Sequence, residues 1–331
     1  MSKTRSTIGL PGKPQTILVT GGAGFIGAHV ARALLSRGDQ VVVVDNFNPY
    51  YDPALKEARV QHLLAEFSPT VVRADLTDRS AMEKIFRDHA FDKIAHLAAQ
   101  AGVRYSLENP RVYVESNVLG TLTLLEISRR HGNPPFIFAS SSSVYGDNDK
   151  VPFSEDDRVE QPVSLYAATK RTVELLALNY HRLHATPCTG LRFFTVYGPW
   201  GRPDMAYFSF TQKMLSGATV DLYNHGNMER DFTFVDDIVR GVVTAIDRPQ
   251  GYELINLGNH QPIRLGEFVA TLEAALGVKA NTRMLPMQPG DVPKTFADVA
   301  KAKRLLGWEP TTKFADGLQK FVAWYRAHFR V

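Results

Sequence analysis

A glycine-rich turn near the start of the chain places the strongest constraint on its fold. The β-branched and apolar run 16–20 leads into Gly21-Gly22-Ala23-Gly24-Phe25-Ile26-Gly27, and apolar residues then recur at helical spacing. A strand, a glycine turn and a helix in this order let backbone N–H groups approach a pyrophosphate at the helix N-terminus. The glycines follow G-x-x-G-x-x-G instead of the G-x-G-x-x-G of the simplest dinucleotide fingerprint. We therefore expect a dinucleotide-binding unit here.

An acidic residue after the next strand indicates which dinucleotide. Four valines at 41–44 form a second candidate strand that ends in Asp45, about 20 residues after the glycines. A carboxylate at this place bonds the ribose hydroxyls of adenosine and repels the extra phosphate of NADP. The alternative is a plain strand–helix turn followed by a surface aspartate. The combination of strand, glycines and acid favours NAD as the cofactor.

Apolar strands and more polar helices alternate along the chain that follows. This alternation predicts an α/β fold with a Rossmann-type, doubly wound parallel sheet that binds its ligand at the C-terminal ends of the strands. His96, inside the fourth strand, is interpreted as a core histidine with satisfied hydrogen bonds. We expect further strands at 70–74, 94–99, 136–139, 191–199 and 252–257, and helices at 80–89, 110–131, 164–185 and 237–245.

The strand–helix rhythm loosens after Trp200 and returns briefly near residue 230. This interleaving predicts a smaller mixed α/β domain in the C-terminal half of the chain. We expect residues 1–199 and 231–262 to form the NAD-binding domain. Residues 200–230 and 263–331 are expected to form the domain that binds the substrate.

Tyr166 and Lys170 are candidates for acid–base chemistry. Pro162 and Ser164 supply a helix start signal, and residues four apart on a helix share one face, so the Lys170 ammonium can lie beside the Tyr166 phenol. A free tyrosine has a pKa of about 10, and a fixed cation nearby lowers that pKa. The pair can therefore remove a proton from an alcohol. The alternative is a surface tyrosine beside a solvated lysine.

Composition excludes several classes of function. The 331 residues carry a net charge of only +4, and their basic residues are scattered, whereas a nucleic-acid site has a basic stripe with interleaved aromatics. The single cysteine, Cys188, excludes an internal disulfide, and no Cys/His spacing indicates a metal site. No run approaches the roughly 20 apolar residues of a membrane helix, and residues 1–14 lack the apolar core of a signal peptide. We expect a cytoplasmic protein that binds neither nucleic acid nor membrane.

Several motifs together resemble an extended short-chain dehydrogenase/reductase. They are the glycine turn, Asp75-Leu76, Leu97-Ala98-Ala99, Ser140-Ser141-Ser142 with Val144-Tyr145-Gly146, and Tyr166-Ala167-Ala168-Thr169-Lys170. The resemblance covers nearly the whole chain after residue 15. The segments at 46–52, 100–106, 198–205, 230–237 and 290–292 are similar to those of UDP-glucuronate 4-epimerases, which are NAD-dependent nucleotide-sugar epimerases.

This resemblance implies a role for each site residue and a homodimer built through the 110–131 and 164–185 helices. Tyr166 is the base, Lys170 binds the nicotinamide ribose and Ser141 bonds the sugar 4-oxygen, with Asn117 in the same catalytic group. Many members have Thr at the position of Ser141, and the serine keeps the hydroxyl. Besides Tyr166 and Lys170, the expected NAD contacts are Gly21, Gly24, Phe25, Ile26, Gly27, Asp45, Asn46, Asp75, Leu76, Leu97, Ala98 and Ala99. The expected substrate contacts are Ser141, Ser142, Ser143, Tyr166, Thr195, Arg202, Tyr223, Arg230 and Asp291.

The implied reaction is 4-epimerisation of a UDP-hexuronate through a transient 4-keto sugar, with NAD tightly bound and regenerated in each turnover. The rivals on the same fold are UDP-galactose 4-epimerase, sugar 4,6-dehydratase, UDP-glucuronate decarboxylase and a non-catalytic NAD-binding regulator. Dehydratases place Asp-Glu where this chain has Ser142 and Ser143. A regulator commonly loses the tyrosine or the lysine, and both are present. The sequence therefore favours UDP-glucuronate as substrate and leaves UDP-glucose/UDP-galactose as the alternative.

Overall fold

Seven parallel strands form the main sheet of the protein, for which a computed structural model describes residues 13–288 and 292–331. Their order is β10-β6-β5-β4-β1-β2-β3, so the chain first builds outward from β1 to β3 and then restarts on the other side with β4. This reversal between β1 and β4 opens a crevice at the C-terminal ends of the strands. The strands are β1 (Thr16–Thr20), β2 (Gln40–Asp45), β3 (Thr70–Arg73), β4 (Lys93–His96), β5 (Phe136–Ser141), β6 (Cys188–Phe193) and β10 (Tyr252–Leu257).

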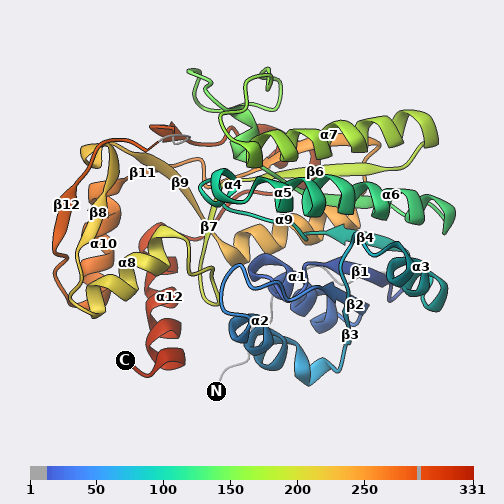
Figure 1. Cartoon of the computed structure of the whole chain (residues 1–331), viewed down its shortest axis with the longest axis horizontal. Helices are drawn as coiled ribbons and strands as arrows, with labels where there is room; N and C mark the ends of the chain where they lie inside the picture. The colour runs from blue at the N-terminus through green and yellow to red at the C-terminus, as the bar shows by residue number, and fades with distance from the viewer. Residues whose placement is uncertain (1–12, 289–291) are drawn as a thin grey trace.

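Helices cover both faces of this sheet (Figure 1). Val41 and Val43 pack with α1 and α9 on one face, whereas Val42 and Val44 pack with α3 and α6 on the other. Successive side chains of a strand point to opposite faces, so burial on both sides explains the unbroken run of valines. The helical segments of this part are α1 (Phe25–Ser36), α2 (Ala54–Arg59), η1 (Val60–Leu64), η2 (Ala65–Phe67), α3 (Arg79–Asp88), α4 (Tyr105–Glu108), α5 (Pro110–Tyr113), η3 (Val114–Leu119), α6 (Gly120–Arg130), η4 (Ser142–Tyr145), α7 (Leu165–His184), α9 (Val235–Asp247) and α11 (Ala300–Leu306).

The predicted doubly wound sheet is confirmed, and two predicted elements differ from the structure. The strand expected over 191–199 is wrong as one element, because the chain leaves the main sheet at Phe194, and β7 (Thr195–Tyr197) pairs with β9 instead. The helix expected over 110–131 contains a wide π-helical turn, η3, at Asn117. The periodicity of apolar residues does not reveal the strand break or the π-helical turn, since both depend on contacts with residues far away in the sequence.

A second lobe lies beyond the C-terminal edge of the main sheet (Figure 1). In it, β9 pairs with β7, β11 and β13, and β8 pairs with β12. Its helices pack against these short strands. The elements are α8 (Ala206–Leu215), β8 (Val220–Leu222), η5 (Tyr223–Gly226), β9 (Glu229–Phe234), β11 (Pro262–Arg264), α10 (Leu265–Leu276), β12 (Thr282–Met284), β13 (Lys294–Thr295) and α12 (Phe314–Phe329).

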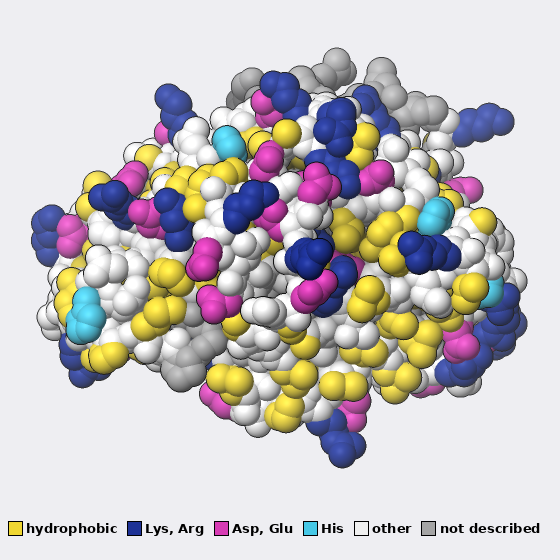
Figure 2. All heavy atoms as spheres, turned by 90° about the horizontal axis from the view of Figure 1, so that it is seen from above, with side chains coloured by type: hydrophobic (Ala, Val, Ile, Leu, Met, Phe, Trp, Pro, Cys, Tyr) yellow, Lys and Arg dark blue, Asp and Glu magenta, His cyan; other side chains and the backbone are white. Residues whose placement is uncertain are grey.

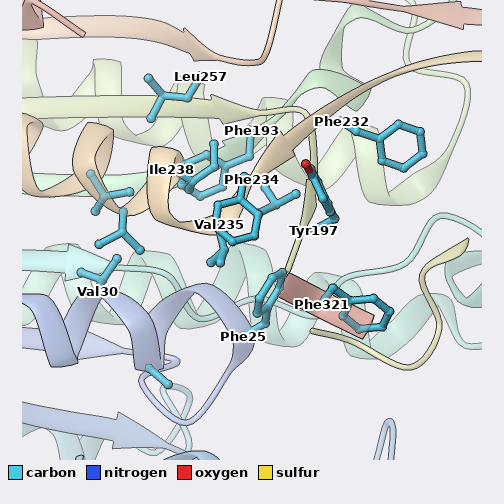
Figure 3. Packing of buried hydrophobic residues seen from close by; sticks show 14 of the residues in the cluster. Phe25, Val30, Phe193, Tyr197, Phe232, Phe234, Val235, Ile238, Leu257 and Phe321 are labelled. Atoms are coloured by element: carbon cyan, nitrogen blue, oxygen red, sulfur yellow. The ribbon is translucent and has the colours of Figure 1, made fainter. Parts of the chain in front are cut away.

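An aromatic core joins the two parts (Figure 3). Tyr197 of β7 is buried between the rings of Phe232 and Phe234, with centroids 6.1 and 5.6 Å away, and its hydroxyl donates to the Phe314 carbonyl at 3.0 Å. Phe25, the first residue of α1, belongs to the same cluster. Close packing of this kind has low compressibility. The second lobe is therefore held firmly against the strand ends where the glycine turn lies.

On the face that Figure 2 shows, Lys and Arg side chains alternate with Asp and Glu, without a continuous basic stripe among the described residues. Within the same residues no cluster of His, Cys, Asp and Glu is suited to a metal ion. A helix long and apolar enough to cross a membrane is likewise not found in the described part of the chain.

Candidate active site

One cleft at the strand C-termini collects every residue predicted to contact NAD. It has a volume of about 230 Å³ and runs from the glycine turn, past the ends of β2 and β4, to Tyr166 and Lys170 on α7. Ser141 at the end of β5 and Arg202 in the turn after β7 line it as well. The cleft therefore joins the expected cofactor residues to the expected catalytic residues.

The turn at the start of this cleft requires glycine. Gly21 has a φ of +68°, and a Cβ there would lie 2.7 Å from the backbone of Ala98. A Cβ on Gly27 would lie 2.1 Å from the Gly21 carbonyl oxygen. Gly24 caps α1 without a side-chain hydrogen bond, so the first N–H groups of the helix are available to an anion. This geometry fits the pyrophosphate of a dinucleotide.

Two carboxylates stand at the next strand ends. Asp45 accepts hydrogen bonds from the backbone N–H groups of Ala23 (3.1 Å) and Phe47 (2.8 Å), which fix its direction in the cleft. Asp75 accepts from the Asn46 amide at 2.7 Å. Burial acts to raise the pKa of Asp75, but hydrogen bonds from Thr77 and Asn46 outweigh it and lower the pKa. Both carboxylates are thus acceptors suited to the hydroxyl and amine groups of an adenosine.

The catalytic end of the cleft is built on α7. Ser164 caps this helix, accepting from the Ala167 N–H at 3.1 Å, which confirms the predicted start signal. Lys170 is buried, and its Nζ donates to the Ala139 carbonyl of β5 at 2.8 Å. Burial lowers the pKa of Lys170 to about 8, against the opposing charge of Glu174. The lysine is thereby anchored to the neighbouring strand.

The predicted lowering of the Tyr166 pKa by Lys170 is wrong for this structure, because Lys170 is bonded to Ala139 and is not among the groups that act on the phenol. Burial raises the pKa of Tyr166 above its ordinary value, although Ser141 and the positive charge of Arg202 act to lower it. Asp204 acts to raise it. The charges that act on the phenol in this structure therefore come from the turn after β7.

Asn117 is buried beneath the catalytic helix. Its amide bonds both the N–H and the carbonyl of Gln100, and also donates to Thr169 Oγ1 at 3.0 Å. Asn117 lies in a π-helical turn, and such turns often occur at functional positions. Asn117, which the resemblance placed in the catalytic group, does not itself line the cleft among the described residues.

His96 is the core histidine that the sequence predicted. Its two ring nitrogens lie 2.8 Å from Thr20 Oγ1 and 2.9 Å from Thr121 Oγ1. Burial and the nearby Lys170 lower its pKa to about 3. The ring is therefore neutral at physiological pH and is used for packing between β1, β4 and α6.

The remaining substrate residues surround the cleft without lining it in the described part of the chain. Ser142 and Ser143 lie in the short helix after β5, Thr195 begins β7, and Tyr223 packs under Arg104 with 4.8 Å between the guanidinium and the ring. Arg230 donates to the Pro293 carbonyl at 3.2 Å. Asp291 lies outside the described residues. Their expected roles require the substrate to extend from the cleft toward the second lobe.

The sequence assigned no site role to Tyr50, Tyr51, Lys56 or Arg59, although segment 46–52 was part of the family resemblance. Tyr50, Tyr51 and Lys56 line the cleft. Arg59 is fully buried and donates to Tyr51 Oη, Ala23 O, Trp200 O and Gly201 O, with distances between 2.7 and 3.2 Å. It ties the glycine turn to the second lobe. In the sequence, Arg59 stands out only because it follows Lys56 by three residues, so that both lie on one face of a helix. Exposed helices commonly show the same spacing.

The chain has close relatives of established identity. A profile of the NAD dependent epimerase/dehydratase family matches residues 17–258. UDP-glucuronate 4-epimerase 4 of Arabidopsis thaliana is 48% identical, over 95% of this chain and 76% of that protein. The crystal structure of UDP-glucuronic acid 4-epimerase from Bacillus cereus, in complex with UDP-glucuronic acid and NAD, superposes with a TM-score of 0.89 at 36% identity, over 95% of this chain and 99% of that one. UDP-glucose 4-epimerase of Thermotoga maritima, with UDP-glucose, gives 0.86 at 33% identity over 95% and 99%.

Proposed function

The chain belongs to the NAD dependent epimerase/dehydratase family, and on that premise we propose that it is an isomerase that converts UDP-glucuronate to UDP-galacturonate by epimerisation at C4. The observation that carries this is one cleft in which a dinucleotide site ends at Tyr166, Ser141 and Lys170. The similarity to the UDP-glucuronate 4-epimerases of Arabidopsis thaliana and Bacillus cereus along 95% of the chain supports the substrate. NAD is the cofactor.

The proposed roles follow from the positions of the polar groups. Bound NAD supplies reversible oxidation at C4 of the sugar. Tyr166 Oη accepts the proton of the C4 hydroxyl during oxidation and returns a proton once the 4-keto sugar has turned over. Ser141, which lines the cleft together with Tyr166, orients the sugar 4-oxygen. Lys170, anchored to Ala139, binds the nicotinamide ribose.

The substrate's anionic groups require a second set of contacts. In our proposal residues 1–199 and 231–262 hold NAD, and residues 200–230 and 263–331 hold the nucleotide sugar. With a carboxylate at C5 the 4-keto intermediate is a β-keto acid, so the enzyme must keep that carboxylate from leaving as carbon dioxide. We assign the carboxylate to Ser142, Ser143, Thr195 and Arg202, and the UDP group to Tyr223, Arg230 and Asp291.

Assembly and location are proposals as well. Val114 and Leu119 on η3 and Leu175 on α7 are 47, 48 and 49% exposed, so the two helical segments expected at a dimer interface carry apolar side chains on their outer surface. We propose a homodimer through these helices. Leu175→Glu should produce monomers in sedimentation, whereas Leu107→Glu should not. Cell fractionation tests the proposed cytoplasmic location.

Product analysis tests the proposed function. The purified protein should convert UDP-glucuronate to UDP-galacturonate with little carbon dioxide or UDP-pentose, and with no added NAD if the cofactor stays bound. UDP-pentose as the main product would make the protein a decarboxylase. The second candidate, UDP-glucose/UDP-galactose 4-epimerase, is favoured by the similarity to the Thermotoga maritima enzyme. Turnover of UDP-glucose and none of UDP-glucuronate would establish it.

A further inference from the structure

Lys56 is paired with the acid that is expected to select NAD. Its Nζ lies 3.9 Å from Asp45 Oδ1, each side chain is 7% exposed, and both residues line the cleft. Lysine and aspartate are rarely this buried unless they are paired. The sequence indicates that Asp45 presents its negative charge to the cofactor, but in the folded chain that charge has a positive neighbour.

Hydrogen bonds to the backbone hold both members of the pair. Asp45 Oδ1 accepts from the Phe47 N–H at 2.8 Å, and Oδ2 accepts from the Ala23 N–H at 3.1 Å. Lys56 Nζ donates to the carbonyl and to the side-chain Oδ1 of Asn48, at 3.1 and 3.0 Å. An ammonium has three N–H donors, so one is left for Asp45 or for a ligand beside it. The two charges therefore have fixed positions in the wall of the cleft.

The pair stands where NAD and NADP differ. In dinucleotide-binding folds, the acid at the end of the second strand bonds the 2′-hydroxyl of the adenosine ribose. NADP carries a phosphate in place of that hydroxyl. Because Lys56 Nζ and Asp45 Oδ1 are 3.9 Å apart in one cleft wall, such a phosphate meets one charge that attracts it and one that repels it.

We propose that Lys56 and Asp45 form a latent subsite for the 2′-phosphate of NADP, in which Lys56 attracts the phosphate and Asp45 keeps it out. Lys56 is thus a specificity-determining residue for the cofactor, and it weakens the preference for NAD that Asp45 creates. The inference rests on the proposed function only in that the cleft holds a dinucleotide. It does not depend on which sugar is epimerised.

Lys56 also supports its own segment of the chain, and this structural role makes a different prediction. Its Nζ bonds Asn48 and lies 5.3 Å from the centroid of the Tyr51 ring. Loss of these contacts would weaken NAD and NADP by the same factor, since the two dinucleotides differ only in the 2′-phosphate. A change in the ratio of the two affinities therefore reports the charge of Lys56 and not its packing.

Arg73 is a second cation close to this strand end. It is the register partner of Asp45 across β2 and β3, and its guanidinium lies 4.0 Å from the centroid of the Phe47 ring. Its side chain is exposed and forms an ion pair with Glu57. Arg73 does not line the cleft in the described part of the chain, whereas Lys56 does. Arg73 is therefore the matched control for Lys56.

Competition between the two dinucleotides tests the proposal. Each variant is equilibrated with an equimolar mixture of NAD and NADP, and the bound nucleotides are released by denaturation and quantified. Asp45→Asn should raise the bound NADP:NAD ratio about tenfold or more, because the repelling charge is lost. Adding Lys56→Met to Asp45→Asn should lower the ratio again by about 10- to 150-fold, the effect of one hydrogen bond to a charged group. Lys56→Met alone should also lower the parent's ratio.

Two further variants separate charge from position. Lys56→Arg retains the cation and should keep the ratio of each background, and Arg73→Met should leave it unchanged. A ratio that Lys56→Met does not alter in either background overturns the proposal, as does an NADP gain that is lost in Arg73→Met. If Lys56→Met does not fold, Lys56→Gln decides by the same criterion. A parent that retains neither dinucleotide would reject the proposed function, whereas a ratio insensitive to Lys56 rejects only this inference.

Discussion

Asn117 holds the backbone of Gln100 at two points: its Oδ1 accepts from the Gln100 N–H at 2.7 Å, and its Nδ2 donates to the Gln100 carbonyl at 3.1 Å. Gln100 follows the segment 97–99 that forms one wall of the cleft. The same amide also reaches Thr169, which lies between Tyr166 and Lys170. One side chain therefore sets the distance between the cofactor wall and the catalytic helix.

We predict that Asn117→Ala destabilises the protein and lowers its activity. It leaves two buried backbone groups of Gln100 without partners, and each such group costs about 1–3 kcal/mol. Urea unfolding should show this loss, and NAD content should fall because the cleft wall is no longer held. Asn281→Ala, which loses one exposed bond to Thr219, should change the unfolding free energy by less than about 0.5 kcal/mol. Equal stabilities of the two variants would contradict the prediction.

Tyr166→Phe should retain the fold and bound NAD but lose most epimerase activity. Removing a general acid–base group typically costs 10²–10⁴-fold, and the phenyl ring keeps the packing against Tyr113. The epimerase rate and the NAD released on denaturation are the two measurements. A variant within about threefold of the parent would show that another group is the base.

Asp45 should control the choice of cofactor. Asp45→Ala removes the acceptor for the ribose hydroxyls and the charge that repels a 2′-phosphate, so NAD should bind more weakly and its advantage over NADP should shrink. Calorimetric titration of apo-protein with each dinucleotide checks this. Stronger binding of NADP than of NAD by the parent protein would refute the assignment.

Glu174 should be essential for stability although it lies behind the site. It accepts from Arg192 Nε at 2.8 Å and from Ser140 Oγ at 2.7 Å, and both ends of the pair are fully buried. Glu174→Gln leaves the Arg192 charge without its partner, which costs about 3–5 kcal/mol. The double variant Glu174→Gln/Arg192→Met should recover much of this loss in the same denaturation assay. If the two single changes are simply additive, the pair is not coupled.

Acid should destabilise the protein through His96. Its pKa is about 3 in the folded state and 6.5 ordinarily, so the unfolded chain binds more protons as pH falls from 6.5 to 3. Stability is lost over that window by up to about 1.4 kcal/mol per pH unit. His96→Gln should reduce the slope of unfolding free energy against pH between 6.5 and 4. At pH 8 the histidine is neutral in both states, so the two proteins should show no difference in slope there.

Patterns local in the sequence were sufficient to predict the framework. The glycine turn, the valines of β2 with Asp45 at their end, and the Ser164 cap of α7 each depend on neighbours within a few residues, so the physical cause is visible in the chain. The fold class, the glycine turn and Asp45 follow from such patterns, whereas the expected roles of Asp75, Leu76 and residues 97–99 came from the family resemblance. Arg59 and Tyr50 could not be predicted in this way, because their partners lie 141 and 154 residues away.

By itself, the sequence determined the parallel sheet, the NAD cleft and the order of Ser141, Tyr166 and Lys170 along it, because backbone sterics, side-chain alternation and helix spacing act locally. The tertiary structure decided where the chain leaves the main sheet at Phe194, and it joined Tyr50 to Asp204, 154 residues away. It also bonded Lys170 to Ala139. These relationships depend on which distant surfaces pack together. The pKa of a group is determined by the charges near it in space more than by its neighbours in the chain.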